Sequence, residues 1–397
     1  ACSYYIFSRT EPKARGIRMT ASPDNEAVLL IADSESSADM LYATGLFVPD
    51  PFTYLRVGGQ STIMMSDLEI DRARAQSKVD EVVSLTDYMD RAKGNAKADP
   101  GLVDAVAELL RDREVEGVRV PNGFPLGYAD KIRDRGFEVA AKEDPFWEER
   151  PVKSSDEVAA ISEVSRHTED ALRMAFGLLS EAAVKDGVLH GPDGPLTSEY
   201  IRTRIHVYLL ERDCIAQHTI VAGGVQGCDP HNGGSGPLRA GEPIIFDLFP
   251  KSTKTGYFAD ITRTVAKGPV SDAFRRLYDT VLEGQETALS RVRAGVDGQE
   301  IHGEVERLFE NRGYETGTKD GRMQGFFHGT GHGFGLEIHE PPRISKISQT
   351  LVAGHVVTVE PGLYYPGLGG GVRIEDNVVV TESGCVNLTR LKKVFEV

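Results

Sequence analysis

The later part of the sequence repeats one order of expected elements, and this repeat constrains the fold more than any other feature. The elements are helical patterns at about 155–182 and 197–213, apolar strand patterns at 241–249 and 255–266, helical patterns at about 271–294 and 298–312, and strand patterns at 355–365 and 371–381. Periods near 3.6 and 2 separate the helical from the strand segments. Helix, helix, strand, strand therefore occurs twice, which predicts an internal duplication with a pseudo-twofold axis.

Each of the four expected strands carries an acidic residue that interrupts an apolar run. These residues are Asp247, Asp260, Glu360 and Glu375. A buried carboxylate is costly unless it is paired or binds a metal. A single buried aspartate is more often satisfied by backbone donors or an arginine, but four carboxylates placed together repel one another and shift toward protonation. Divalent cations are the simplest remedy.

Three histidines lie between the two acidic strand pairs, in the glycine-rich segment HGTGHGFGLEIHE. They are His328, His332 and His339. A zincin helix is excluded because HExxH is absent: His339-Glu340 is followed by Pro341, Pro342 and Arg343, so no histidine lies four residues after His339. Two aspartates, two glutamates and one histidine form an oxygen-rich donor set, which favours ions such as Mn²⁺ over structural zinc. Five ligands suit two ions that share bridging carboxylates.

The first part of the chain has a different pattern and is expected to form a separate domain. Strand patterns at 26–33, 61–67, 116–121 and 137–143 alternate with helical patterns near 38–43 and 103–114. Such alternation predicts an α/β domain. A proline- and charge-rich segment near 150 is followed by Ser154 and Glu157, which form a capping box for the next helix. We therefore expect domains at 1–150 and 151–397.

Charge and cysteine content narrow the functional classes. The formal net charge of −15 disfavours binding to nucleic acid or to an anionic membrane surface, because no basic stripe offsets it. The four cysteines (Cys2, Cys214, Cys228 and Cys385) are scattered without CxxC spacing, which indicates a reduced, cytoplasmic protein. Residues 1–16 lack the apolar core of a signal peptide, and no apolar run has the length of a spanning helix.

The chain resembles the pita-bread metallopeptidases in four successive motifs, DLFPKSTKTGYFADITRT, HGTGHGFGLEIHE, VTVEPGLYY and GVRIEDNVVVT. That family contains methionine aminopeptidase, aminopeptidase P, prolidase and the metal-free creatinase. The resemblance is strong over 150–397, and LYATGLF resembles the creatinase-type N-terminal domain more weakly. It implies an α/β N-terminal domain and an α+β C-terminal pita-bread (creatinase/aminopeptidase) domain with an internal pseudo-twofold.

The resemblance also implies a role for each motif residue. Metal ligands are Asp247, Asp260, His332, Glu360 and Glu375, of which Asp260 and Glu375 bridge two divalent ions, with Mn²⁺ favoured and Co²⁺ or Zn²⁺ as alternatives. A hydroxide held between the ions attacks the scissile carbonyl. Glu360 is the general base, His339 stabilises the oxyanion and His231 is the third catalytic residue. The substrate-binding group is His328, Arg343, Arg373 and Tyr364. Dimerisation is expected from the family alone.

Two features separate this chain from other branches. The ligand set excludes creatinase, and the extra N-terminal domain argues against methionine aminopeptidase. The segment HEPPRIS (339–345) resembles prolidases, in which an arginine at the position of Arg343 holds a free carboxylate. Prolidase, acting on Xaa-Pro dipeptides, is therefore preferred to aminopeptidase P, which acts on longer peptides. A non-catalytic pita-bread binding module is the alternative from another class.

One departure from the family pattern concerns the first acidic strand pair. Twelve residues separate Asp247 from Asp260, two more than is usual in the family, and Leu248-Phe249-Pro250 replaces small residues. An even insertion preserves the alternation of side chains between the two faces of a strand. Both aspartates are therefore still expected on the same side, with altered geometry beside them.

Overall fold

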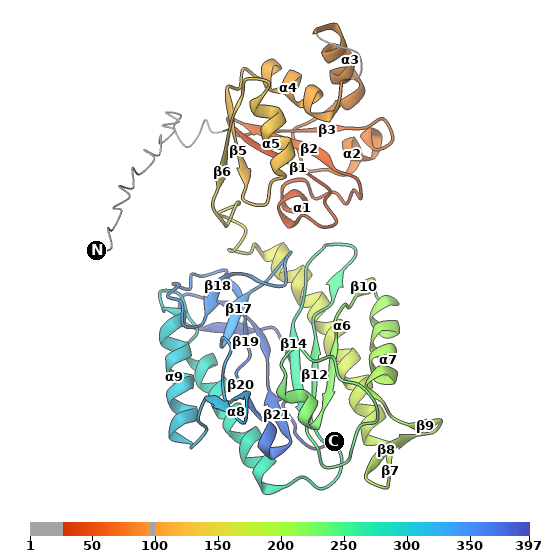
Figure 1. Cartoon of the computed structure of the whole chain (residues 1–397), viewed down its shortest axis with the longest axis vertical. Coiled ribbons are helices and arrows are strands. Elements are labelled where there is room, and N and C mark those ends of the chain that lie inside the picture. The colour runs from red at the N-terminus through yellow and green to blue at the C-terminus, as the bar shows by residue number, and fades with distance from the viewer. Residues whose placement is uncertain (1–26, 96–99) are drawn as a thin grey trace, which may run out of the picture. The chain divides into compact units, whose positions relative to one another are not determined.

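The protein is described by a computed structural model that covers residues 27–95 and 100–397 (Figure 1). Cys2 and the segment 1–16 lie outside the described residues. Contacts between residues divide the chain into two compact units, Ala1–Asp144 and Pro145–Val397, and each is described by itself. Of the helices that the structure describes, none combines the length and the apolar character needed to span a bilayer.

The N-terminal unit is a six-stranded mixed sheet with strand order β4-β3-β2-β1-β5-β6. The strands are β1 (Val28–Ala32), β2 (Phe52–Val57), β3 (Gln60–Met65), β4 (Glu81–Ser84), β5 (Gly117–Pro121) and β6 (Glu138–Lys142). The helices are α1 (Ala38–Thr44), α2 (Ile70–Gln76), α3 (Leu85–Asn95), α4 (Leu102–Asp112) and α5 (Leu126–Arg133). Apolar residues of α4 pack with β1 and β5 to form its core. The expected α/β character of this unit is confirmed.

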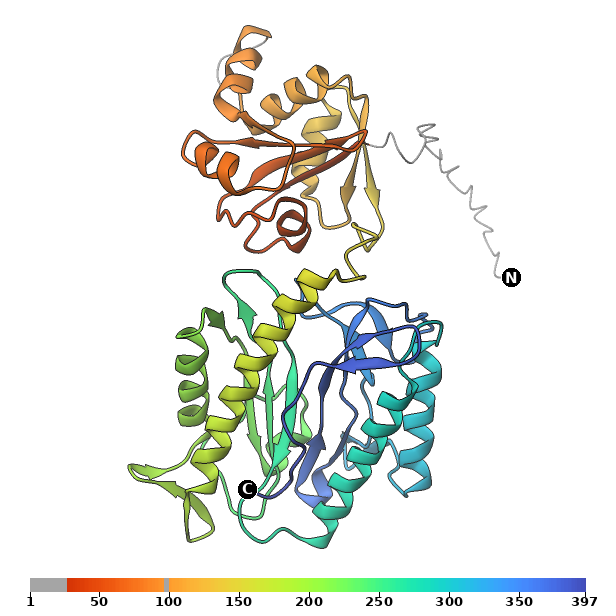
Figure 2. The ribbon, with the colours of Figure 1, turned by 180° about the vertical axis from the view of Figure 1, so that it is seen from behind.

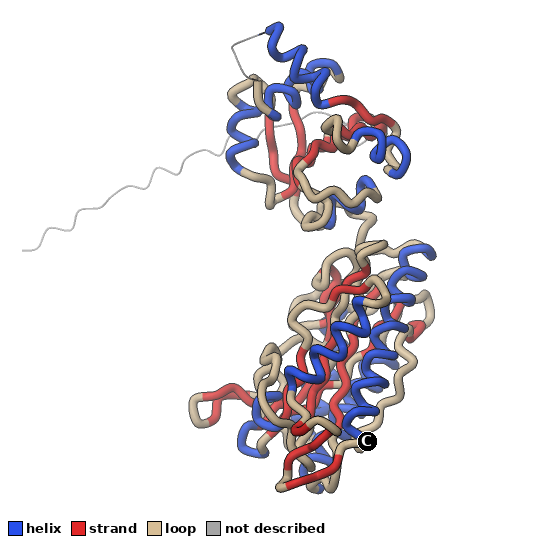
Figure 3. The backbone as a smooth tube through the Cα atoms, turned by 90° about the vertical axis from the view of Figure 1, so that its right-hand side faces the viewer, coloured by secondary structure: helices blue, strands red, loops and turns tan. Residues whose placement is uncertain are grey.

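Four long helices and two central sheets make up the C-terminal unit. The helices are α6 (Ser155–Ser180), α7 (Ser198–Leu210), α8 (Asp272–Arg291) and α9 (Gly298–Asn311). Each begins at a hydrogen-bonding cap residue, and α6 has the predicted capping box between Ser154 and Glu157. In Figure 1, α6 and α8 lie behind the strands, and in Figure 2 they lie in front of them, with α7 and α9 toward the two outer sides; Figure 3 shows the same elements turned by 90°.

The two sheets correspond to the two halves of the predicted repeat. One sheet has the order β11-β12-β14 and the other β18-β17-β19-β22-β23. Their strands are β11 (Ile220–Gly223), β12 (Ile244–Leu248), β14 (Ile261–Val265), β17 (Gly331–Gly333), β18 (Glu340–Ile344), β19 (Val356–Val359), β22 (Asp376–Val380) and β23 (Cys385–Asn387). One apolar cluster serves α6, α7, β12 and β14, and a second serves α8, α9, β19 and β22. Each half thus packs its own helix pair against its own strands.

Short elements complete this unit. They are β7 (Ala183–Lys185), β8 (Val188–Gly191), β9 (Gly194–Pro195), β10 (Cys214–Ile215), β13 (Lys251–Ser252), β15 (Gly317–Lys319), β16 (Arg322–Gln324), β20 (Gly362–Tyr365) and β21 (Gly370–Arg373), with 3-10 turns η2 (Gly224–Cys228) and η3 (Pro366–Leu368). Cys214, Cys228 and Cys385 are free thiols.

Three strands expected to be continuous are shorter or broken. The segment 255–266 is a strand only from Ile261, so Asp260 lies just before β14. The segment 355–365 is divided into β19 and β20 at Glu360-Pro361, and 371–381 into β21 and β22 at Ile374-Glu375. The reason is that β20 and β21 pair with each other in a separate ribbon, whereas β19 and β22 belong to the five-stranded sheet. Glu360 and Glu375 therefore lie where the chain passes from one sheet to another, whereas Asp247 lies within β12.

Candidate metal centre

The predicted site residues line one cavity of about 810 Å³ in the C-terminal unit. Its lining includes all five predicted ligands, namely Asp247, Asp260, His332, Glu360 and Glu375. It also includes His231, His328, His339, Arg343 and Arg373. Tyr364 lies beneath them, fully buried, where its hydroxyl contacts two of the lining residues. The fold thus gathers residues that are up to 144 positions apart, from His231 to Glu375.

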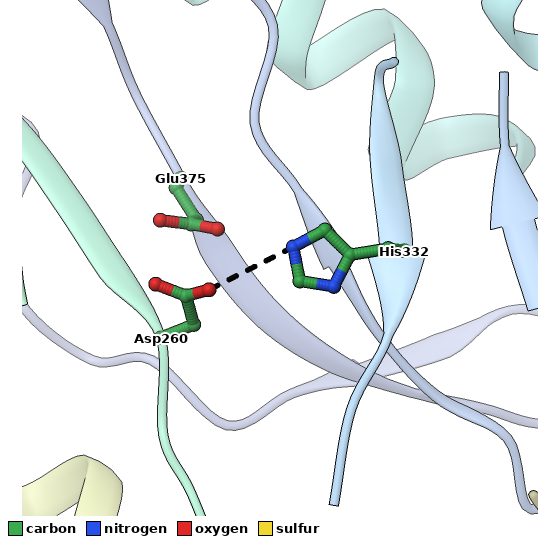
Figure 4. A group of neighbouring side chains, drawn as sticks. All are labelled: Asp260, His332 and Glu375. Carbon is green, nitrogen blue, oxygen red and sulfur yellow. Dashed lines mark ion pairs between the residues drawn. The ribbon is translucent and has the colours of Figure 1, made fainter. Parts of the chain in front are cut away.

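Three of these side chains form a compact group that can hold a metal ion. One donor atom from each of Asp260, His332 and Glu375 lies within 4.8 Å of the others, and all three residues are buried (Figure 4). The ion pair drawn in Figure 4 joins His332 Nε2 to Asp260 Oδ2 over 3.7 Å. Asp247 and Glu360 line the same cavity outside this group.

Contacts between the two halves set the position of the two carboxylates. The Glu375 peptide nitrogen donates to the Thr262 carbonyl over 3.0 Å, and the Thr262 hydroxyl donates to Glu375 Oε2 over 2.7 Å. Thr262 lies on β14, two residues after Asp260. Its side chain and backbone therefore bring Glu375 of the second half beside Asp260 of the first.

The electrostatics of this group favour a bound cation. Burial and the neighbouring carboxylates Glu375, Asp247 and Glu360 raise the pKa of Asp260 well above its ordinary value. Burial and the charges of Glu360 and Asp247 likewise raise the pKa of Glu375. Binding of a cation stabilises the ionised carboxylates of Asp260 and Glu375, because each negative charge then has a positive partner. The donor set therefore fits a divalent metal.

His332 offers the correct nitrogen to such an ion. Its Nδ1 donates to the Gly333 carbonyl over 3.1 Å, so Nε2 is the nitrogen that faces the carboxylates. Nε2 also lies 3.2 Å from Glu360 Oε1. Burial alone would raise the pKa of Glu360, but the contact with His332 and the charges of His328 and Arg373 lower the pKa to about 2. Glu360 is therefore ionised, and its carboxylate lies beside the same nitrogen of His332.

A buried chain of hydrogen bonds holds Asp247. Arg373 Nη2 donates to Asp247 Oδ2 over 2.6 Å, and Arg373 Nη1 donates to the Tyr364 hydroxyl over 2.8 Å. The Tyr364 hydroxyl lies 2.8 Å from His328 Nε2, whose ring donates through Nδ1 to the Gly329 carbonyl. Burial lowers the pKa of His328 to about 4, so the ring is neutral and its Nε2 accepts a hydrogen bond from the Tyr364 hydroxyl. Asp247 Oδ1 is buried and has no hydrogen-bond partner among the described residues, as a ligand atom should.

Arg343 and His339 line the same cavity close to His332. Arg343 is opposite His332 in the register of β18 with β17. Burial and the charges of His332 and Arg343 lower the pKa of His339 to about 4, so its imidazole is neutral near pH 7. The His339 and His332 rings meet edge to face with centroids 4.4 Å apart.

Several supporting residues were not identified from the sequence. Besides Thr262, the structure adds His302 on α9. Its Nδ1 lies 2.9 Å from the hydroxyl of Thr330, between two site histidines. The Thr330 carbonyl in turn accepts from the Glu360 peptide nitrogen over 2.7 Å. Only the position of Thr330 within HGTGH could have indicated such a role.

Comparisons with known proteins agree with this geometry. Residues 150–382, more than half of the chain, match the model of metallopeptidase family M24. The Xaa-Pro dipeptidase of Pyrococcus furiosus is 28% identical over 338 residues, which cover 85% of this chain and 86% of that protein.

Two solved structures extend the similarity to both units. An Xaa-Pro dipeptidase from Bacillus anthracis aligns with a TM-score of 0.78 and 23% identity, over 94% of this chain and 95% of that one. An X-Pro aminopeptidase from Thermotoga maritima aligns with a TM-score of 0.78 and 25% identity, over 94% and 98%. The expected pita-bread fold is thereby confirmed, and the chain belongs to metallopeptidase family M24.

Proposed function

We propose that this protein is an Xaa-Pro dipeptidase, a metal-dependent hydrolase that cleaves the peptide bond before a C-terminal proline. The observation that carries the proposal is the unpaired guanidinium of Arg343 in the cavity that holds the metal ligands. Among the described residues, no carboxylate forms an ion pair with it. A dipeptide whose scissile bond lies at the metal ligands must place its carboxylate nearby, and a guanidinium binds a carboxylate through two parallel hydrogen bonds.

Five residues would hold two divalent ions, namely Asp247, Asp260, His332, Glu360 and Glu375. The oxygen-rich donor set supports Mn²⁺, with Co²⁺ and Zn²⁺ as alternatives. When bound, such ions polarise the scissile carbonyl and lower the pKa of water. Asp260 and Glu375 are proposed as the bridging pair because each comes from a different half and both lie in the compact group of donors.

Three residues are proposed to act on the reacting groups. Glu360 is ionised and accepts a proton at its carboxylate, as a general base requires. His339 is neutral and retains one N–H, which it directs at the oxygen that becomes negative in the transition state. His231 lines the same cavity and influences the charge state of His339, which supports a role in the same step.

The remaining polar residues are proposed to orient the substrate. Arg343 holds the proline carboxylate, while His328, Tyr364 and Arg373 form the buried chain beneath the substrate. Because Arg373 also contacts Asp247, this chain couples the substrate side of the cavity to the first ligand.

Tyr364→Phe tests that chain. The variant loses the hydroxyl that joins Arg373 to His328, and we expect kcat to fall by about 10-fold to 100-fold, the usual cost of losing a residue that orients a ligand. Metal content should change little, because the Arg373–Asp247 contact remains. Steady-state kinetics and metal analysis check this, with Tyr314→Phe, outside the cavity lining, as the control. Unchanged kcat would remove Tyr364 from the proposal.

The function is tested with Ala-Pro, Leu-Pro and Ala-Pro-Ala as substrates of the manganese-loaded protein, with Asp260→Asn in parallel. Turnover of the dipeptides alone is the expected result. Turnover of the tripeptide as well would assign the protein to aminopeptidase P, the alternative that the Thermotoga maritima structure represents. No turnover that depends on Asp260 would support a binding module without catalysis.

Three further properties are proposed with this function. The protein is a cytoplasmic homodimer, for which its acidity, scattered cysteines and family resemblance are the support. Its partners are short peptides rather than nucleic acid or membranes, since the net charge is −15. A creatinase-like domain at 1–150 precedes the catalytic domain at 151–397. Light scattering of the purified chain tests the dimer.

A further inference from the structure

The imidazole of His339 receives no hydrogen bond from any described residue, and its side chain is exposed to the cavity. Its only ring contact among those residues is the edge-to-face one with His332. The direction of the side chain therefore depends on the backbone that carries it. An imidazole that stabilises an oxyanion must be held in its orientation to within about 0.5 Å, so the backbone that carries His339 must itself be fixed.

The backbone before His339 has little intrinsic rigidity. It runs from β17 to β18 through Gly333 and Gly335, and glycine allows more conformations than any other residue. Gly333 pairs with Glu340, whereas the preceding His332 pairs with Arg343, so Pro341 and Pro342 are additional residues on β18. This bulge turns the chain and directs His339 toward His332.

A buried ion pair closes this turn. Lys153 Nζ lies 2.7 Å from Glu340 Oε2, and each side chain is 1% exposed. Lys153 Nζ also donates to the Arg150 carbonyl over 2.9 Å, and the other oxygen, Glu340 Oε1, accepts from the Glu337 peptide nitrogen over 3.1 Å. The pair covers Gly335, where an added Cβ would lie 2.8 Å from Lys153 Cε. Residues 335–340 therefore lie between the Lys153–Glu340 ion pair and the bulge.

We propose that Lys153 and Glu340 are positioning residues that act through His339, an inference that rests on the role proposed for His339. Glu340 is the next residue in the chain, so fixing its carboxylate fixes the peptide that carries the imidazole. The pair joins the segment before α6 to β18 across 187 positions of sequence. Because this ion pair lies directly beside His339, it holds a residue of the site in addition to being part of the core.

Stability does not explain why the chain keeps this ion pair. The attraction between two buried charges roughly offsets the cost of removing them from water, and a matched uncharged pair is often as stable. Removing only one partner leaves an uncompensated buried charge and destabilises the fold. The informative variant is therefore the double substitution Lys153→Met with Glu340→Gln, which removes both charges of the buried pair and nearly preserves volume. Glu340 Oε1 also lies 3.6 Å from Arg150 Nε, and Arg150 pairs with Glu337 as well, so the variant leaves Arg150 that ion pair.

The test is a comparison of kinetics in two backgrounds. In the otherwise native chain, the double variant should remain folded, bind the native amount of manganese, and lose about 10-fold to 100-fold in kcat with little change in KM. In a His339→Ala background, the same double substitution should cause no further loss, because the residue through which it acts is gone. Arg312→Met with Glu283→Gln removes an exposed pair of similar geometry and serves as the matched control.

Two kinetic outcomes would overturn the proposal. One is native kcat in the folded double variant. The other is an equal loss of kcat with and without His339, which would indicate a general effect on the fold.

A measurement that does not need turnover separates this inference from the proposed function. In metal-free protein labelled with ¹⁵N-histidine, the His339 ring resonances, assigned with His339→Ala, should shift or broaden in the double variant and stay unchanged in the control. Unchanged resonances would refute the inference even if dipeptides are cleaved. Shifted resonances in a protein that cleaves no dipeptide would support the positioning of His339 and refute the proposed function instead.

Discussion

Asp260→Asn is expected to abolish dipeptide turnover while making the metal-free protein harder to unfold. Loss of Asp260, the proposed bridging ligand, should remove several kcal/mol of transition-state stabilisation, so kcat/KM should fall by roughly 10³-fold or more. In the metal-free protein, Asp260 is one of four carboxylates around a buried cavity, and its raised pKa means that the charged form opposes folding near neutral pH. Asparagine keeps the shape and removes that repulsion.

Steady-state kinetics measure the loss of turnover, and urea unfolding with and without manganese measures the change in stability. The midpoint of the metal-free variant should exceed that of the metal-free native chain, whereas manganese should stabilise the native chain more than the variant. Glu382→Gln, which removes an exposed carboxylate elsewhere, serves as the control for net charge. A variant that binds manganese normally would contradict the assignment of Asp260 as a ligand.

Arg343→Met is expected to weaken cleavage of Leu-Pro by roughly 10²-fold in kcat/KM, mainly through KM, because charge-assisted hydrogen bonds to a carboxylate are lost. The backbone should remain in place, since the Arg343 peptide nitrogen donates to Gln349 Oε1 and that bond does not involve the side chain. Steady-state kinetics on Leu-Pro and on its C-terminal amide measure the effect. The amide lacks the charge that the guanidinium binds, so the variant should cleave it about as well as the native chain does.

Lys346→Met is the matched control for Arg343, because it removes a cation three residues away that pairs instead with Glu306 over 3.1 Å. The control should keep native KM for the dipeptide. Equal losses on Leu-Pro and on its amide would show that Arg343 supports the site in general and does not hold a carboxylate.

The parts of the fold that follow from local sequence were predictable. The helices expected from about 155 and 298 begin at Ser155 and Gly298, because the side chains of Ser154 and Asp297 accept hydrogen bonds from backbone nitrogens within three residues. The strand that contains Asp247 was also predictable from local sequence, because its apolar run lies within nine residues, 241–249. The duplicated helix pairs followed from the order of such segments.

The remainder depends on partners distant in sequence. Glu360 and Glu375 lie between strands because β20 pairs with β21 apart from the main sheet, and no periodicity in either segment reports that choice. The ion pair of Lys153 with Glu340 spans 187 positions and is equally invisible. The ligand motifs were predictable because their chemistry requires buried carboxylates in apolar segments. The residues that hold them were not, because threonine and lysine are common and carry no such signature.

The division of the proposed ligands between the two halves has a consequence for synthesis of the protein. Asp247 and Asp260 belong to the first half, and His332, Glu360 and Glu375 to the second. A growing chain that has folded only its first half holds two acidic groups and no histidine ligand, so it cannot assemble the donor set. Hydrolytic competence then arises only when the halves dock, and partly made chains carry no working peptidase centre.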